Sequence, residues 1–125
     1  VFISCSEKFR TRVAWYDLDP EYTDKWIRHE IGQNAYSHTL QVGDMDGDGD
    51  LDVISGNNGD QGDPKYSPVI LFLQGEKNWS SQTLTLQGAY NSYVGDAEGD
   101  GDLDFFRYDG HVGTSYELWL NNTVK

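Results

Sequence analysis

Short apolar runs follow one another along this chain, with polar segments between them. Residues 12–16, 69–73 and 116–120 are examples, rich in Val, Leu and aromatic residues, and turn-forming Gly, Asn, Asp or Pro residues separate such runs. This pattern is typical of β-strands joined by turns. No stretch of ten or more residues shows the 3.6-residue period of an amphipathic helix. The sequence therefore predicts an all-β fold.

The runs repeat with a period of 52 residues, so that residues 1–4 align with 53–56 and with 105–108. A fixed period of this size indicates stacked or radially arranged units. Four strands per unit, connected as hairpins, describe a β-propeller blade. We therefore predict a β-propeller segment over residues 1–125, with about two and a half blades of four antiparallel strands. The predicted divisions are a partial blade at 1–36, a full blade at 37–88 and a partial blade at 89–125.

The repeat places large aromatic residues at recurring positions. The alignment makes Trp15, Phe72 and Trp119 equivalent, and Trp26 and Trp79 each open a later strand of their unit. Repetition at equivalent places favours packing inside or between blades for all four tryptophans over a role in ligand binding.

Two acidic, glycine-rich stretches lie one period apart. We call residues 44–52 the first acidic loop and residues 96–104 the second acidic loop. Each places five carboxylates at alternate positions: Asp44, Asp46, Asp48, Asp50 and Asp52 in the first, and Asp96, Glu98, Asp100, Asp102 and Asp104 in the second. Carboxylates this close repel one another, so each loop is expected to bind a cation. Ligand sets of six to eight flexible oxygens at about 2.3–2.6 Å favour Ca²⁺ over Mg²⁺.

The first loop begins like an EF-hand, with acidic residues at positions 1, 3 and 5 and a glycine at position 6. An EF-hand also needs a Glu at position 12, where this chain has Ser55 and, in the second copy, Arg107. The apolar residues that follow predict a strand rather than a helix. The loop therefore joins two strands, with Asp52 at position 9 as the closing carboxylate and Asp50 offering its backbone carbonyl.

The net charge of −12 arises largely in these loops, which hold ten of the 21 acidic residues. Only nine Lys and Arg residues are present and they form no patch, so nucleic acid is not an expected partner. No apolar run approaches the roughly 18 residues that a membrane span needs. The chain begins at Val1 without Met, which favours a processed or excised segment. Weak Ca²⁺ sites are filled outside cells, so we expect a secreted or cell-surface location.

The two loops and the strands after them resemble FG-GAP/VCBS-type repeats, the calcium-binding blades of integrin α-subunit propellers and of many bacterial surface and secreted proteins. The resemblance covers essentially the whole chain. It implies a β-propeller in which each loop joins the innermost strand of a blade to the second strand. It also implies two Ca²⁺ sites, formed by the ten acidic residues named above, with Asp50 and Asp102 contributing carbonyl oxygens. Glu98 departs from the usual Asp, so the second site is expected to be the weaker.

Motifs for catalysis are not found. The three histidines lack metal-ligand spacing and no serine lies in a G-x-S-x-G elbow. We therefore expect a non-catalytic module for protein or glycan recognition or adhesion, and the long loop at 57–66 is a candidate binding segment. The alternatives are a part of a secreted carbohydrate-active enzyme and a purely structural spacer. Expected partners are the remaining blades of a longer chain or copies of the chain itself, and a protein or glycan ligand.

Overall fold

The computed structural model describes residues 1–4, 12–59, 66–110 and 115–123, so most of the candidate binding loop at 57–66 lies outside the described residues. The described residues form no helix, and the all-β prediction is confirmed. The strands are β1 (Phe2–Ser4), β2 (Arg12–Leu18), β3 (Trp26–Gln33), β4 (Ser37–Gly43), β5 (Asp52–Asn57), β6 (Val69–Gln74), β7 (Trp79–Thr85), β8 (Asn91–Gly95), β9 (Asp104–Tyr108) and β10 (Tyr116–Trp119).

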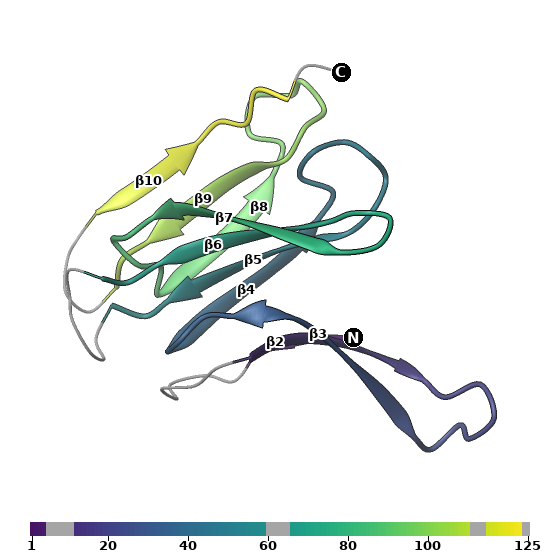
Figure 1. The fold of residues 1–125 in the computed structure, drawn as a ribbon. Coiled ribbons are helices and arrows are strands. Elements are labelled where there is room, and N and C mark those ends of the chain that lie inside the picture. Colours follow the sequence, from purple (N-terminus) through teal and green to yellow (C-terminus); the bar gives the residue numbers. More distant parts are fainter. Residues whose placement is uncertain (5–11, 60–65, 111–114, 124–125) are drawn as a thin grey trace.

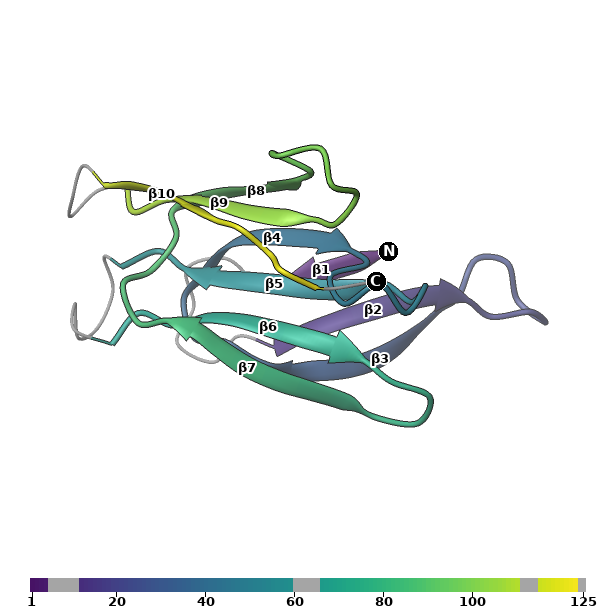
Figure 2. The ribbon, with the colours of Figure 1, turned by 90° about the horizontal axis from the view of Figure 1, so that it is seen from above.

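The strands pair into three antiparallel sheets, each built from strands that are consecutive in the chain. The first sheet has the order β1-β2-β3, the second β4-β5-β6-β7 and the third β8-β9-β10. Figure 1 shows the second sheet lying between the other two, and Figure 2 shows the same arrangement from above. The prediction of four-stranded antiparallel blades, one whole and two partial, is confirmed. The blade boundaries at 36/37 and 88/89 stay predictions.

Strand β5 is buried along its whole length because it is covered on both faces. Val53 and Phe72 face the first sheet and pack with Val13, whereas Ile54 and Val69 pack with residues that include Phe105 of the third sheet. Burial on both faces explains why residues 53–56 of this strand are a continuous run of apolar and small residues rather than an alternating one. Gly56 is required there, because a Cβ would lie 2.7 Å from the Cβ of Ala89.

The predicted packing of the tryptophans is only partly correct. Trp79 and Trp119 pack against the cores between the sheets, but Trp26 is 52% exposed, in a β2–β3 hairpin that projects beyond the second sheet (Figure 1). The equivalence of Trp15 with Phe72 and Trp119 is wrong. Trp15 pairs with Phe2, whose counterpart Ile54 pairs with Leu71, not Phe72. A shift of one residue moves a side chain to the opposite face of a sheet.

Arg107 on β9 stands where the second sheet has Ser55 and is fully buried. Its Nε donates to Glu117 Oε2 at 2.9 Å, and its Nη2 lies 2.7 Å from Glu117 Oε1. Its Nη1 donates to the carbonyl oxygen of Gly88 at 2.7 Å, in the segment between the second and third sheets. Glu117 is the cross-strand neighbour of Arg107 on β10. The buried cation is thus paired, and it ties the third sheet to the connection that precedes it.

We predict that Glu117→Gln lowers the free energy of unfolding by about 2–3 kcal/mol at neutral pH, because it leaves a buried guanidinium without its counter-charge. Hydrogen bonds from Arg107 and Trp119 hold the pKa of Glu117 below its ordinary 4.5. A lowered carboxyl pKa stabilises the fold at pH values above 4.5, and the contribution is lost as the pH falls through the folded-state pKa. The difference between the two proteins in urea unfolding should therefore shrink in acid.

The matched control is Glu76→Gln, which changes an exposed glutamate in the turn between β6 and β7. It should leave the unfolding free energy within about 0.5 kcal/mol of the original at every pH. A Glu117→Gln effect of the same size in acid as at neutral pH would contradict the prediction.

Candidate metal centre

The two acidic loops occupy the same place in two neighbouring sheets. The first joins β4 to β5, and the second joins β8 to β9. Gly47 and Gly49 have φ angles of 77° and 95°, and their counterparts Gly99 and Gly101 have 79° and 93°. Residues with a Cβ rarely adopt these angles, so the glycines allow the backbone to fold around the acidic side chains. The two acidic loops therefore adopt the same turn conformation at these glycines.

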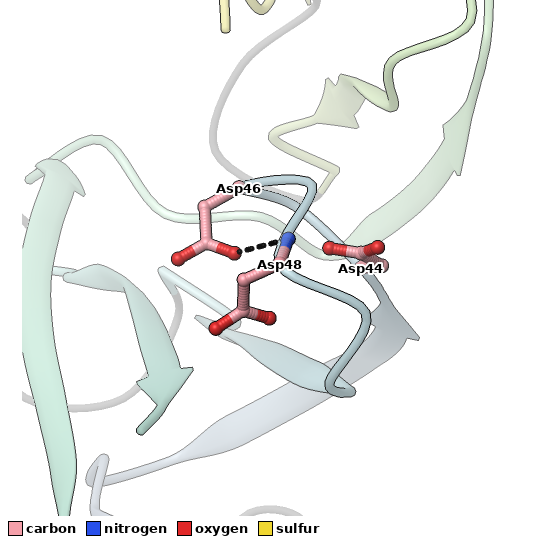
Figure 3. A group of neighbouring side chains, drawn as sticks. All are labelled: Asp44, Asp46 and Asp48. Carbon is pink, nitrogen blue, oxygen red and sulfur yellow. Dashed lines mark hydrogen bonds between the residues drawn. The ribbon is translucent and has the colours of Figure 1, made fainter. Parts of the chain in front are cut away.

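In the first loop, the carboxylates of Asp44, Asp46 and Asp48 come together (Figure 3). Each offers one oxygen, and these three oxygens lie within 4.8 Å of one another. The loop also folds around its own side chains, since Asp44 accepts the N–H groups of Gly47 at 2.7 Å and Gly49 at 3.1 Å. Figure 3 shows the carboxylate of Asp46 accepting the N–H of Asp48, at 3.2 Å. Converging carboxylate oxygens of this kind fit a hard divalent cation.

Asp52, the predicted closing ligand, lies outside this group of three. It is fully buried, and its two oxygens accept the backbone N–H groups of Met45 at 2.8 Å and Gln74 at 2.9 Å. Asp50 is exposed and its N–H donates to Asp48. Asp52 thus ties the start of the first loop to the last residue of β6. Whether Asp50 and Asp52 also bind an ion stays a prediction.

The second loop repeats this hydrogen-bond pattern. Asp96 accepts N–H groups from Gly99 and Gly101, as Asp44 does in the first loop. Asp104 accepts the N–H of Ala97 at 2.7 Å and that of Asn121 at 2.9 Å. In the part of the chain that the structure describes, however, only the first loop brings three carboxylates close enough together to bind one metal ion. Asp96, Glu98 and Asp100 do not converge in the same way.

The electrostatics of both loops reflect crowded negative charge. Burial raises the pKa of Asp52, and the nearby charges of Asp46 and Asp48 raise it further, although the two N–H groups it accepts act in the opposite direction. Desolvation raises the pKa values of Glu98 and Asp102, and the surrounding acidic residues add to both shifts. Asp102 is buried, and its Oδ1 atom has no hydrogen-bond partner. A bound cation would reverse the unfavourable potential in these places.

The sequence reasoning missed two structural features of the site. One is the use of the position-9 carboxylate as a backbone tie, and the signal for it was its place directly before a buried strand. The other is Asn121, whose side-chain amide donates to the carbonyl oxygens of Met45 at 2.7 Å and Leu103 at 3.3 Å. No local sequence pattern marks this asparagine, because Met45 lies 76 residues away.

Residues 1–55 match the model of the FG-GAP-like repeat family, and this segment runs from β1 through the first acidic loop into β5. No curated protein and no solved structure matches the chain. None of the described residues lies in a helix long and apolar enough to cross a membrane. The chain therefore carries an FG-GAP-like repeat over residues 1–55, within an all-β fold of propeller-like blades.

Proposed function

We propose that this chain is a non-catalytic, calcium-stabilised β-propeller module of a secreted or cell-surface protein that serves protein or glycan recognition. The observation that carries the calcium assignment is the convergence of Asp44, Asp46 and Asp48 on one tight turn. The FG-GAP-like repeat at residues 1–55 contains this turn and supports the module as a whole.

The ion would act as a fastener of the turn and not as a catalyst. Two like charges about 5 Å apart repel by around 3 kcal/mol at an effective dielectric of about 20, before screening by salt. Ca²⁺ at the three converging oxygens removes this repulsion. Asp52 and Asp104 hold the ends of the loops through backbone N–H groups, so the turns are arranged before an ion arrives. The converged group in the first loop and the longer Glu98 in the second support the first loop as the stronger site.

We expect saturating Ca²⁺ to raise the free energy of unfolding by about 2.7 kcal/mol per site at a hundredfold excess over Kd. Differential scanning calorimetry of the chelated and calcium-loaded protein measures this. Asp44→Ala should remove the larger part of the rise and Asp96→Ala the smaller part. Asp52→Ala should differ from both. The N–H groups that it leaves unpaired are buried or part-buried, whereas those that Asp44 and Asp96 accept are exposed, so it lowers stability by roughly 2–4 kcal/mol even in chelator.

Either of two results would count against these assignments. A melting temperature that does not change with calcium would refute the proposal that the ion stabilises the turn. A larger loss from Asp96→Ala than from Asp44→Ala would refute the ranking of the loops.

Exposed aromatic residues support a role in recognition. Tyr22 and Trp26 lie in the projecting β2–β3 hairpin and are 57% and 52% exposed, and Lys25 stands 5.6 Å from the centre of the Tyr22 ring. Aromatic rings with an exposed face are frequent in protein interfaces and can stack on other flat groups. The exposed Tyr66 marks the end of the long loop at 57–66, the other candidate surface.

We predict that the protein binds members of a glycan array or a panel of cell-surface proteins, and that it does not turn over polysaccharides. Trp26→Ala should weaken binding at least tenfold if the hairpin carries recognition, since truncating a central aromatic contact removes 2 kcal/mol or more in typical hot spots. Tyr66→Ala tests the long loop, and Leu86→Ala is the control on an exposed apolar residue elsewhere. Hydrolysis that depends on a carboxylate outside both acidic loops would instead favour the alternative, part of a carbohydrate-active enzyme. A module with neither activity would be the structural spacer.

The face of the third sheet that points away from the second supports a proposal about partners. Tyr93, Phe106 and Leu118 form one cross-strand row on this face, and Tyr108 stacks on Tyr116 in the next row at 4.7 Å. Tyr93 and Tyr116 are each 67% exposed. The corresponding faces of the first and second sheets are covered by the next sheet. We propose that further blades of a longer chain, or a second copy, cover this face.

The chain by itself should therefore associate as concentration rises, or bind a dye that reports exposed apolar surface. Sedimentation velocity with a concentration series measures the first property. The double variant Tyr116→Ser and Leu118→Ser should reduce both signals, and Leu86→Ser should not. A monodisperse monomer at high concentration without dye binding would contradict the proposal.

A further inference from the structure

The two acidic loops are joined by one residue, Asn121, which follows β10. Its backbone N–H donates to Oδ1 of Asp104, the last acidic residue of the second loop, at 2.9 Å. Its side-chain amide donates to the carbonyl oxygen of Met45 in the first loop at 2.7 Å. The same amide lies 3.3 Å from the carbonyl oxygen of Leu103. Asn121 therefore holds both loops at once.

The contact in the first loop falls between two residues of the candidate metal group. Met45 lies between Asp44 and Asp46, and its N–H is already fixed by Asp52. With its carbonyl oxygen held by Asn121, both polar backbone atoms of Met45 are fixed. The direction in which Asp44 and Asp46 leave the backbone thus depends on a residue attached to the other loop.

Apolar contacts run beside this polar bridge. Leu103 of the second loop lies against Gly43, where a Cβ would be 2.5 Å from the Leu103 Cδ1 atom. Met45 and Leu103 also line an apolar cavity of about 150 Å³ together with Trp119 and Asn121. Apolar contacts have no preferred direction, so they orient the two loops less strictly than hydrogen bonds do. The hydrogen bonds of Asn121 provide the defined link.

The second sheet has an amide residue in the same position. Gln74 follows Phe72 by two residues, as Asn121 follows Trp119, and its backbone N–H donates to Asp52 as that of Asn121 donates to Asp104. Both repeats thus place an amide side chain where the hairpin ends beside an acidic loop. Of these two residues, Asn121 is the one whose side-chain amide contacts the acidic loop of the preceding repeat within the described part of the chain.

We propose that Asn121 is a positioning residue that couples the two acidic loops, so that Ca²⁺ bound in one loop raises the calcium affinity of the other. The proposal rests on the proposed binding of calcium by both loops. An ion in the second loop restricts the loop residues before Asp104, among them Leu103, whose carbonyl oxygen accepts the amide of Asn121. Asn121 then restricts Met45 between Asp44 and Asp46. A loop that has already lost conformational freedom loses less when its own ion binds. Linkage requires the effect to be the same in both directions.

The test is a double-mutant cycle measured by calorimetric titration of the chelated chain with CaCl₂. Asp96→Ala removes a proposed calcium ligand from the second loop. It does not alter the residues that contact Asn121. We expect it to lower the calcium affinity of the first loop roughly three- to tenfold, the factor that one hydrogen bond supplies. In the Asn121→Ala background the same substitution should change that affinity less than about twofold.

The matched control is Asn122→Ala. Among the described residues, the side chain of Asn122 makes a long contact, 3.4 Å, with the carbonyl oxygen of Leu120. In this background Asp96→Ala should retain its full effect. A purely structural role for Asn121 would lower both affinities and leave the coupling factor unchanged, which would overturn the proposal. An Asp96→Ala substitution without effect on the first loop in the original chain would overturn it as well.

Two further measurements do not require an Asn121 variant to fold. Asp44→Ala must lower the affinity of the second loop by the same factor as Asp96→Ala lowers that of the first. The side-chain amide resonances of Asn121 in NMR spectra should shift with calcium in Asp44→Ala and in Asp96→Ala, and a response to only one loop would overturn the proposal. If neither loop binds calcium at millimolar concentration, the proposed function itself fails. If both loops bind calcium without coupling, only the coupling role of Asn121 is refuted, and the proposed function stands.

Discussion

A buried carboxylate that accepts two backbone N–H groups is the interaction on which both acidic turns depend. Asp52 receives one N–H from inside its own loop and one from the end of β6. Asp104 does the same with Ala97 and Asn121. Two charge-assisted hydrogen bonds compensate for removing a carboxylate from water, which would otherwise be strongly unfavourable. Each turn is thereby attached to the hairpin beside it, and the remaining acidic side chains are left to project from a fixed frame.

This arrangement separates two roles that one acidic loop has to perform. Asp52 and Asp104 hold the backbone, whereas Asp44, Asp46 and Asp48 converge near the surface and carry the charge that a cation would neutralise. A fixed frame reduces the conformational entropy that the loop loses when an ion binds. Burial is the main cause of the raised pKa values of Asp52, Glu98 and Asp102, and the like charges that this frame keeps close together raise them further.

A second constraint acts on the sheets, because burial of the apolar residues on a sheet face requires another layer to cover that face. The second sheet meets this condition, with Val53 and Phe72 on one face and Ile54 and Val69 on the other. The third sheet covers one face with Phe105 and leaves aromatic rows exposed on the other. Arg107 lies on the covered face as a buried cation, and it is tolerated there because Glu117 and the carbonyl oxygen of Gly88 complete its hydrogen bonds.

The sequence by itself determined the strands, the period and the positions of the acidic loops. These features follow from local chemistry, since short apolar runs and well-placed glycines act within a few neighbours. Only the tertiary structure decided which face Trp15 occupies, because one residue of register reverses a strand's faces. It also decided that Asp52 ties backbone segments together and that Asn121 reaches Met45. Such contacts join residues that are brought together only when neighbouring sheets pack, and no spacing in the chain encodes them.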